Sequence, residues 1–393
     1  MTTKETHSFS PQWFLKALGN GGLAVSFFMY LMFMIAHQTP IPTFTDVYRE
    51  LSKLNLASLA VAIDLVIILY FAIRFFKELY IQTQRYFIFK KSAHYKTLKG
   101  SNNEVSLMNI PLTYAMAINV LFTLGAVFVP NLWSVVEYLF PFALLGFVIV
   151  GASAIKIYLH YFKETIADGN FMYVENNNFS QMTAPFTFVM VAVGLAAPAA
   201  MSHTLATNIV GMILSIFFLI LTFLLININL VLGFKSIGRY GVHHETVPTL
   251  WIMIPIMTLV GITIVRLTSG VFHHIVKAPI NPAIFMILIT ILVSIQVVFG
   301  LFGYSVMKKH NYFDHYVTGN KFSIGSYALI CPGVAFTVLG MFYVAYGFVK
   351  TSFVTAFSPM HLLLILPFAI VQLVTVITIH KLDKKAPSPM VIM

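Results

Sequence analysis

The sequence predicts an all-α integral membrane protein with ten transmembrane helices. Apolar residues make up 59% of the 393 positions and charged residues only 9%, against roughly 25% charged in an average soluble domain. At about 20 apolar residues per span, ten helices use roughly half of the chain. A soluble enzyme or a soluble nucleic-acid binder needs a polar, charged surface. Both classes are therefore excluded, although the net charge is +11.

Intervals without a formal charge locate the helices. The first apolar run lacks the short core and the small-residue cleavage site of a signal peptide, so we expect a permanent first span. The interval 176–234 is too long for one helix, and Ser202 with His203 marks a predicted turn within it. Asn131 and Trp133 mark another turn. The ten predicted helices lie near 13–36, 55–76, 106–129, 132–158, 182–201, 205–234, 247–268, 280–306, 323–347 and 359–380.

The distribution of basic residues predicts the orientation, because loops on the cytoplasmic side carry an excess of Lys and Arg. With ten helices, 19 of the 24 basic residues fall on the side of the two termini. We therefore expect a cytoplasmic N-terminus over 1–12, a membrane domain over 13–380 and a cytoplasmic tail over 381–393. The expected location is a bacterial inner (plasma) membrane. The five basic residues on the opposite side are Arg49, Lys53, Arg266, Lys277 and Lys350.

Short connections on the outer side predict five helical hairpins. Only a few residues around Pro130 join the third and fourth helices, and a few around Ser202 join the fifth and sixth. Helices joined so closely pack as antiparallel neighbours.

The odd-numbered predicted helices differ from the even ones in carrying repeated Gly, Pro and hydroxylic or amide residues. Proline inside a helix frees a carbonyl group, and a membrane tolerates such groups mainly where protein or water satisfies them. The alternation favours odd helices that line a polar path, although small residues that only aid packing are the alternative. These residues are Gly19, Asn20, Gly21 and Gly22; Asn109, Pro111, Thr113 and Asn119; Pro185, Thr187, Gly194 and Pro198; Pro248, Thr249, Pro255, Thr258 and Gly261; and Gly325, Ser326, Pro332, Gly333 and Thr337.

Sequence runs in three of these helices resemble helices of a known family. The runs 248–255, 326–332 and 185–194 are similar to the seventh, ninth and fifth helices of the tellurite-resistance/dicarboxylate transporter family. That family includes the bacterial tellurite-resistance protein, yeast malate and sulfite transporters, and plant slow-type anion channels. The resemblance covers about 13–380 and rests on the helix alternation more than on any one motif.

The resemblance implies a specific architecture. Five hairpins stand in quasi-fivefold arrangement around a central pore, with the odd helices lining it and the even helices outside. Members conduct or transport small anions, and bacterial and plant members are trimers, so we expect a homotrimer. Phenylalanines of the third and ninth helices occlude the family's pore. This chain departs from that pattern, with Leu329 and Cys331 in the ninth helix and Tyr114 as the best match in the third.

The alternation of the helices and the family resemblance together indicate which residues line the pore. We expect Tyr114 and Leu329 to meet at the narrowest point, with Phe188 and Phe336 as the next candidates. Pro255 and Pro332 are each expected to bend a pore helix and to leave a carbonyl pointing at the path. Gly21 and Thr187 complete the expected lining.

Charged residues within or beside the predicted spans are the remaining candidates. Asp64 lies near the middle of the second helix, where a charge is costly. It is either a packing residue that is protonated or hydrogen-bonded, or a proton-coupling carboxylate. Arg266 and Lys277 could form an electropositive outer vestibule, or Arg266 could simply anchor its helix. The histidines lie in loops or at helix ends, so we expect no metal or haem site, and one cysteine permits no intrachain disulfide.

We interpret the chain as a membrane channel or transporter for small anions. Its other expected partner is the lipid bilayer, and we expect it to bind no nucleic acid. The alternative is a proton-coupled carrier of dicarboxylate, sulfite or tellurite. No nucleotide-binding motif or nucleophile elbow occurs in a plausible context, so we expect no enzyme activity, no catalytic residue and no cofactor. A membrane enzyme or sensor for a lipid-soluble substrate would need a reactive cluster within the spans, and the sequence has none.

Overall fold

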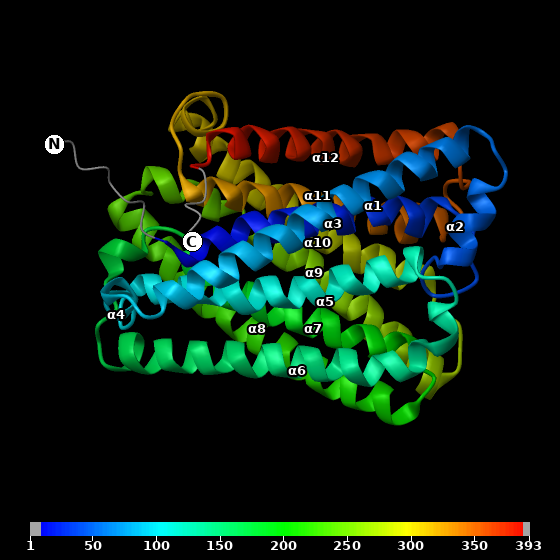
Figure 1. The fold of residues 1–393 in the computed structure, drawn as a ribbon, viewed down its shortest axis with the longest axis horizontal. Helices are drawn as coiled ribbons and strands as arrows, with labels where there is room; N and C mark the ends of the chain where they lie inside the picture. The colour runs from blue at the N-terminus through cyan, green and yellow to red at the C-terminus, as the bar shows by residue number, and fades with distance from the viewer. Residues whose placement is uncertain (1–8, 388–393) are drawn as a thin grey trace.

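The computed structural model describes residues 9–387, and within this range the chain is helical and contains no strand. The helices run along the long axis of the molecule (Figure 1). Their bounds are α1 Phe14–Met34, α2 Phe44–Leu51, α3 Leu56–Phe89, α4 Ala93–Leu98, α5 Asn109–Phe128, α6 Val136–Tyr161, α7 Thr183–Met201, α8 Leu205–Tyr240, α9 Met253–Val271, α10 Pro282–Lys309, α11 Ile330–Phe342 and α12 Pro359–Lys385.

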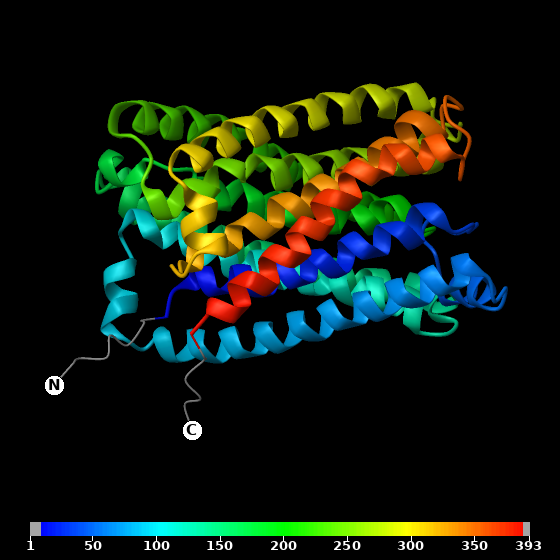
Figure 2. The ribbon, with the colours of Figure 1, turned by 90° about the horizontal axis from the view of Figure 1, so that it is seen from above.

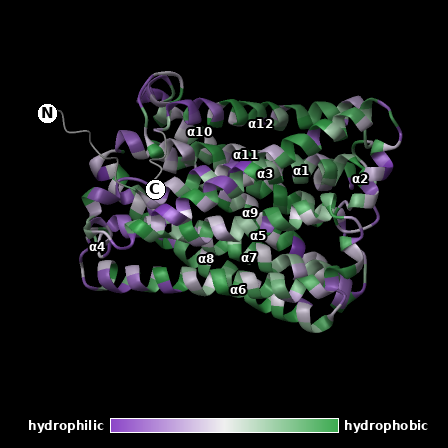
Figure 3. Cartoon of the chain, viewed as in Figure 1, coloured by the Kyte–Doolittle hydropathy of each residue, from purple (hydrophilic) through white to green (hydrophobic). Residues whose placement is uncertain are grey.

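The prediction of ten membrane-crossing helices is confirmed by length and composition. Ten helical stretches in residues 9–387 are long and apolar enough to cross a membrane. Hydrophobic residues dominate their middle, and hydrophilic residues gather toward the two ends of the molecule (Figure 3). The stretches are Pro11–Met34, Leu56–Phe89, Asn102–Phe128, Leu132–Ala167, Ser180–Met201, Leu205–Tyr240, His244–Val276, Pro282–Lys309, Ile324–Val349 and Pro359–Lys385.

Several helices extend past their predicted boundaries at charged C-terminal ends. α8, for example, runs to Tyr240 rather than to 234. α3 runs to Phe89 rather than to 76, because the amphipathic residues that follow Phe76 continue the helix. α12 runs to Lys385, so most of the expected tail 381–393 is helical as far as it is described. Residues 1–8 of the expected N-terminal segment and residues 388–393 of the tail lie outside the described residues.

Burial divides the ten long stretches into two classes. In α1, α5, α7, α9 and α11 the most apolar part is 61–89% buried, and in α3, α6, α8, α10 and α12 it is only 28–39% buried. We call these the inner and the outer helices. The outer helices expose long Leu, Ile and Phe side chains, as expected of surfaces that face lipid rather than water.

Each inner helix packs against two other inner helices and against the outer helix that follows it in the chain. α1 contacts α5 and α11, α7 contacts α5 and α9, and α9 contacts α11. The inner-to-outer pairs are α1 with α3, α5 with α6, α7 with α8, α9 with α10 and α11 with α12. Figure 2 shows α12 crossing the bundle obliquely beside the chain's first helix.

Four inner helices begin in the same way, with a 3₁₀ segment followed by an α-helix whose third residue is proline. The prolines are Pro111, Pro185, Pro255 and Pro332. A proline in the first turn removes no helical hydrogen bond. Pro255 and Pro332 therefore lie where a 3₁₀ segment passes into an α-helix, and not in the middle of a continuous α-helix as expected.

A cluster of ionic side chains joins the first and last long helices at one end of the molecule. Lys16 of α1 lies 2.7 Å from Glu78 of α3 and 3.5 Å from Asp383 of α12. Arg74 of α3 pairs with the same Asp383, and the Tyr327 hydroxyl donates to it at 2.8 Å. We name this end the terminal end, and the opposite end, where α2 lies, the distal end (Figure 1).

Candidate functional site

A polar cavity lies among the inner helices at the terminal end. Its volume is about 170 Å³, and its lining comes from the first residues of all five inner stretches. Gln12, Asn109, Thr183, Thr249 and Ser323 represent the five. These side chains offer hydroxyl and amide groups but no cation. We name this space the terminal cavity.

The terminal cavity is also where the helix N-termini converge. Successive spans alternate in direction, so the five inner helices run in parallel from the terminal end to the distal end. The N-terminus of a helix carries a partial positive charge and free N–H groups. Five such termini make the cavity favourable for an anion. Glu245 is the one charged residue of the lining, and its negative charge repels an anion.

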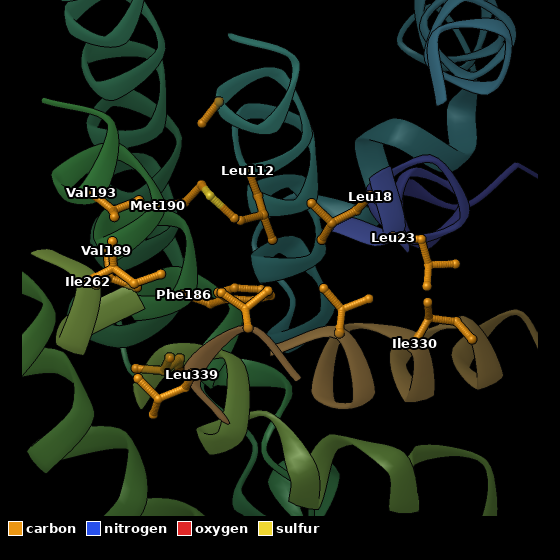
Figure 4. Close-up of a cluster of buried hydrophobic side chains, with 14 of the residues drawn as sticks. Leu18, Leu23, Leu112, Phe186, Val189, Met190, Val193, Ile262, Ile330 and Leu339 are labelled. Atoms are coloured by element: carbon orange, nitrogen blue, oxygen red, sulfur yellow. The ribbon is translucent and has the colours of Figure 1, made fainter. Parts of the chain in front are cut away.

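A smaller apolar cavity of about 90 Å³ continues toward the middle of the bundle. It shares Phe186, Pro255 and Cys331 with the terminal cavity. In Figure 4, Phe186 and Met190 of α7 lie in an apolar cluster with Leu18, Ile262 and other side chains from neighbouring helices. Thr258 is its one hydroxylic lining residue. We name it the middle cavity.

A third cavity, of about 120 Å³, lies toward the distal end. It shares five apolar lining residues with the middle cavity, so the three spaces follow one another along the bundle. Arg266 of α9 is the one charged residue in its lining, beside Asn119 and Thr123 of α5. We name it the distal cavity. The shared residues are Val25, Met116, Met190, Leu259 and Ile262.

Arg266 is positioned by a single hydrogen bond to a neighbouring inner helix. Its Nη1 atom donates to the Val193 carbonyl of α7 at 2.8 Å, and the residue is half-buried. A guanidinium has five N–H donors. No other hydrogen bond from it is found in residues 9–387, and no carboxylate pairs with it there. A positive charge with free donors in a small cavity is suited to holding a small anion.

The structure separates the two residues expected to form an outer vestibule. Arg266 lines the distal cavity. Lys277 is exposed, adopts a left-handed backbone conformation just beyond α9, and is absent from the lining. The electropositive character of the distal cavity therefore comes from Arg266 alone among its lining residues.

Of the four other residues expected to line the pore, two line a cavity and two do not. Pro255 and Pro332 line the terminal cavity. Gly21 instead packs between α3 and α5, where an added Cβ would meet Phe75 and Met116 at 2.9 Å. Thr187 is fully buried.

Two glycines close to Gly21 in the same helix line a cavity where Gly21 was expected to do so. Gly19 and Gly22 line the middle cavity, because they lie on the other side of the same helix. The Thr187 hydroxyl donates to the Met108 carbonyl at 3.0 Å and to the Thr183 carbonyl at 2.8 Å, so it joins α7 to the start of α5.

The structure does not bring Tyr114 and Leu329 together at a constriction. The Tyr114 hydroxyl lies 2.9 Å from the hydroxyl of Thr83 in the outer helix α3, so the ring points away from the bundle axis. Neither Tyr114 nor Leu329 lines any of the three cavities. These contacts argue against the expected gate.

The two reserve candidates also face outward. Phe188 packs against Tyr158 and Phe218 of the outer helices, and Phe336 packs against Phe368 of α12. The aromatic residue between the terminal and middle cavities is Phe186, which follows Pro185. The repeated proline of the inner helices is the sequence signal that marks this position, because Phe186 directly follows it in α7.

Asp64 lies apart from the three cavities. It is 8% exposed on α3 and lines a separate cavity on the side of the bundle, between α3 and the distal half of α1. Its Oδ2 atom has no hydrogen-bond partner in the described part of the chain. The expected hydrogen bond to a neighbouring helix is therefore not formed by this atom.

Comparison with models of known protein families finds no match to this chain, and comparison with curated proteins finds no matching relative.

Proposed function

We propose that this membrane protein is a channel or transporter for small anions, and that the anions pass through the terminal, middle and distal cavities in turn. The observation that carries the proposal is the chain of three cavities that share lining residues along the bundle. A path of this kind crosses the apolar thickness of ten membrane-length helices.

Two features at opposite ends of the path support an anion as the substrate. Five parallel helix N-termini surround the terminal cavity, and the Arg266 guanidinium lines the distal one. Between them the lining of the middle cavity is apolar, with the hydroxyl group of Thr258 and no charged residue. An uncharged constriction binds an ion weakly enough to release it. Selection among small anions would then depend on size and dehydration.

The pairwise contacts of the inner helices support a fivefold architecture. They close in the order α1, α5, α7, α9, α11 and back to α1, and each outer helix packs on the inner helix before it. We propose that the five hairpins surround one central pore. Membership of the tellurite-resistance/dicarboxylate transporter family, assembly as a homotrimer, and a bacterial inner membrane with cytoplasmic termini belong to the same proposal.

The proton-coupled carrier remains the second candidate because a carboxylate lines the path. That residue is Glu245 in the terminal cavity, whereas Asp64 lies outside it. Flux of a carrier follows an imposed pH gradient at zero voltage, and flux of a channel does not. In a carrier that uses this carboxylate, Glu245→Gln abolishes the response to the pH gradient.

The single cysteine of the chain provides a direct test of the path. Cys331 lines both the terminal and the middle cavity and is partly exposed. We expect the anionic thiol reagent 2-sulfonatoethyl methanethiosulfonate to modify Cys331 and to block nitrate flux into liposomes. Nitrate in excess should slow the modification.

Cys331→Ser is the matched control and should conduct nitrate with no sensitivity to the reagent. Mass spectrometry gives the extent of modification independently of flux. Complete modification of Cys331 with unchanged nitrate flux would contradict a path through these cavities.

A further inference from the structure

A fourth cavity, larger than the three axial ones, lies on the side of the bundle. It has a volume of about 450 Å³ and lies between the distal half of α1 and the first half of α3. None of its lining residues is shared with the axial cavities. It is therefore a separate space. Its lining is Phe27, Tyr30, Leu31, Met34, Ile35, Glu50, Ala57, Ala60, Val61, Ile63, Asp64, Ile67 and Phe357.

This lateral cavity opens toward the surface that faces lipid. Ile63 is 53% exposed and Phe357 57% exposed, and Ala57 and Ala60 are exposed as well. These residues belong to the lipid-facing side of α3 or to the loop before α12. A molecule dissolved in the bilayer can reach the cavity without entering the axial path.

The lateral cavity contains one buried carboxyl group without a partner. Asp64 is 92% buried, and its Oδ2 atom accepts no hydrogen bond from residues 9–387. The neighbouring polar groups are already engaged: the Tyr30 hydroxyl donates to Gln372 at 2.8 Å, and Lys53 pairs with Glu50 at 2.6 Å. An unpaired buried carboxyl group is costly, so a ligand that supplies a donor gains the interaction that the protein leaves unmade.

We propose that the lateral cavity binds a lipophilic amine from the bilayer, with the ammonium group on Asp64 and the apolar body among the aliphatic and aromatic side chains. Three properties of the cavity favour this class. The carboxyl group complements a single positive charge. Phe27 and Tyr30 contribute aromatic rings to the lining, and aromatic rings attract cations. The volume lies within the range of pockets that hold small organic ligands, roughly 300–1,000 Å³.

An uncharged occupant makes a different prediction. A lipid acyl chain would fill the same apolar lining and would leave Asp64 neutral and unpaired. Its binding would not depend on the charge of either partner. The proposal therefore rests on the charge of the ligand and the charge of residue 64, and both can be changed without changing shape.

The experiment measures binding of 1-adamantylamine to the full-length protein in lipid nanodiscs by isothermal titration calorimetry, with empty nanodiscs as the blank. An alkyl amine is charged at neutral pH, as lysine is. The matched neutral probe is 1-adamantanol. We expect the amine to bind the wild type about ten- to a hundredfold more tightly than the alcohol, the ratio expected for a hydrogen bond to a charged group.

Two variants separate the charge from the space. Asp64→Asn keeps the size of the side chain and should weaken amine binding by the same factor, about ten- to a hundredfold. Ala60→Phe leaves Asp64 in place but fills the cavity one helical turn away, and it should abolish binding of both probes. Size-exclusion profiles and melting temperatures show that each variant is folded.

Equal binding of amine and alcohol by the wild type would overturn the proposal and favour an acyl chain. Unchanged amine binding by Asp64→Asn would overturn it as well. Nitrate flux is not used as a readout, so the outcome is independent of the proposed anion path.

Discussion

Arg266 gives the sharpest test of the proposed anion path. Arg266→Gln removes the one charged group in the lining of the distal cavity and keeps an amide that can still donate to the Val193 carbonyl. An anion in the distal cavity then loses its Coulomb attraction to the guanidinium. We expect the apparent affinity for a conducted anion to fall, and the half-saturating concentration for flux to rise.

The size of the effect follows from the dimensions of the cavity. A volume of about 120 Å³ corresponds to a sphere of about 3 Å radius, so a bound anion lies about 5 Å from the guanidinium, within direct Coulomb range. At that distance the attraction is about 3 kcal/mol for an effective dielectric constant of about 20, and about 1 kcal/mol in bulk water. The half-saturating concentration should therefore rise roughly 5- to 200-fold.

Nitrate flux into liposomes, measured against nitrate concentration, gives this quantity. Arg266→Lys retains the charge and should stay close to the wild type. Lys277→Gln removes an exposed charge that does not line the cavity, and it should have no effect on half-saturation. If Arg266→Gln saturates at the wild-type concentration, or if both glutamine variants shift equally, the reasoning from cavity position is refuted.

Further predictions concern the constriction, the ionic cluster, a histidine contact and the topology. Phe186→Ala should increase conductance, most for large anions, because it removes an aromatic ring between the terminal and middle cavities; Phe218→Ala on the outer helix α8 should leave single-channel recordings unchanged. Asp383→Asn should lower the free energy of unfolding by about 1–3 kcal/mol, because it leaves the partly buried Arg74 without its carboxylate partner, and thermal unfolding in detergent measures the loss. Burial, the adjacent His244 ring and the charge of Lys309 lower the pKa of His310, so the unfolded chain binds its proton more readily. The melting temperature should therefore be highest above about pH 6.5 and fall below it, and His310→Asn should reduce that fall. A reporter fused after the last helix should be active in the cytoplasm; activity on the opposite side would contradict the orientation.

The sequence predicted the helices well because membrane spans leave a strong and local signal. Charge-free intervals located ten apolar helices, several of which extend beyond their predicted C-terminal ends, notably α3, α8 and α12. There the helix continues through polar residues beyond the apolar run. The sequence singled out Arg266 as a candidate for an outer vestibule or a helix anchor, but it did not indicate the cavity that Arg266 lines without Lys277.

The rotation of each helix about its own axis was not predictable in the same way. The polar side chains of the inner helices do not mark the side that lines a cavity, because some of them, such as Thr187, bond to a neighbouring helix instead. Adjacent residues therefore face different surroundings: Gly22 lines the middle cavity, and Gly21 packs against α3. For the same reason the sequence does not show that the Tyr114 hydroxyl contacts Thr83 or that Phe186 lines the terminal and middle cavities.

The ionic cluster at the terminal end has a consequence for biosynthesis. A chain inserted into the membrane from its N-terminus exposes Lys16 long before Asp383 has been synthesised, yet Glu78 arrives with the next span and lies 2.7 Å away. Glu78 can therefore neutralise the lysine while the ribosome is still translating. Arg74, by contrast, can pair with Asp383 only after α12 has been synthesised. A chain that lacks α12 would therefore retain Arg74 without the carboxylate that pairs with it.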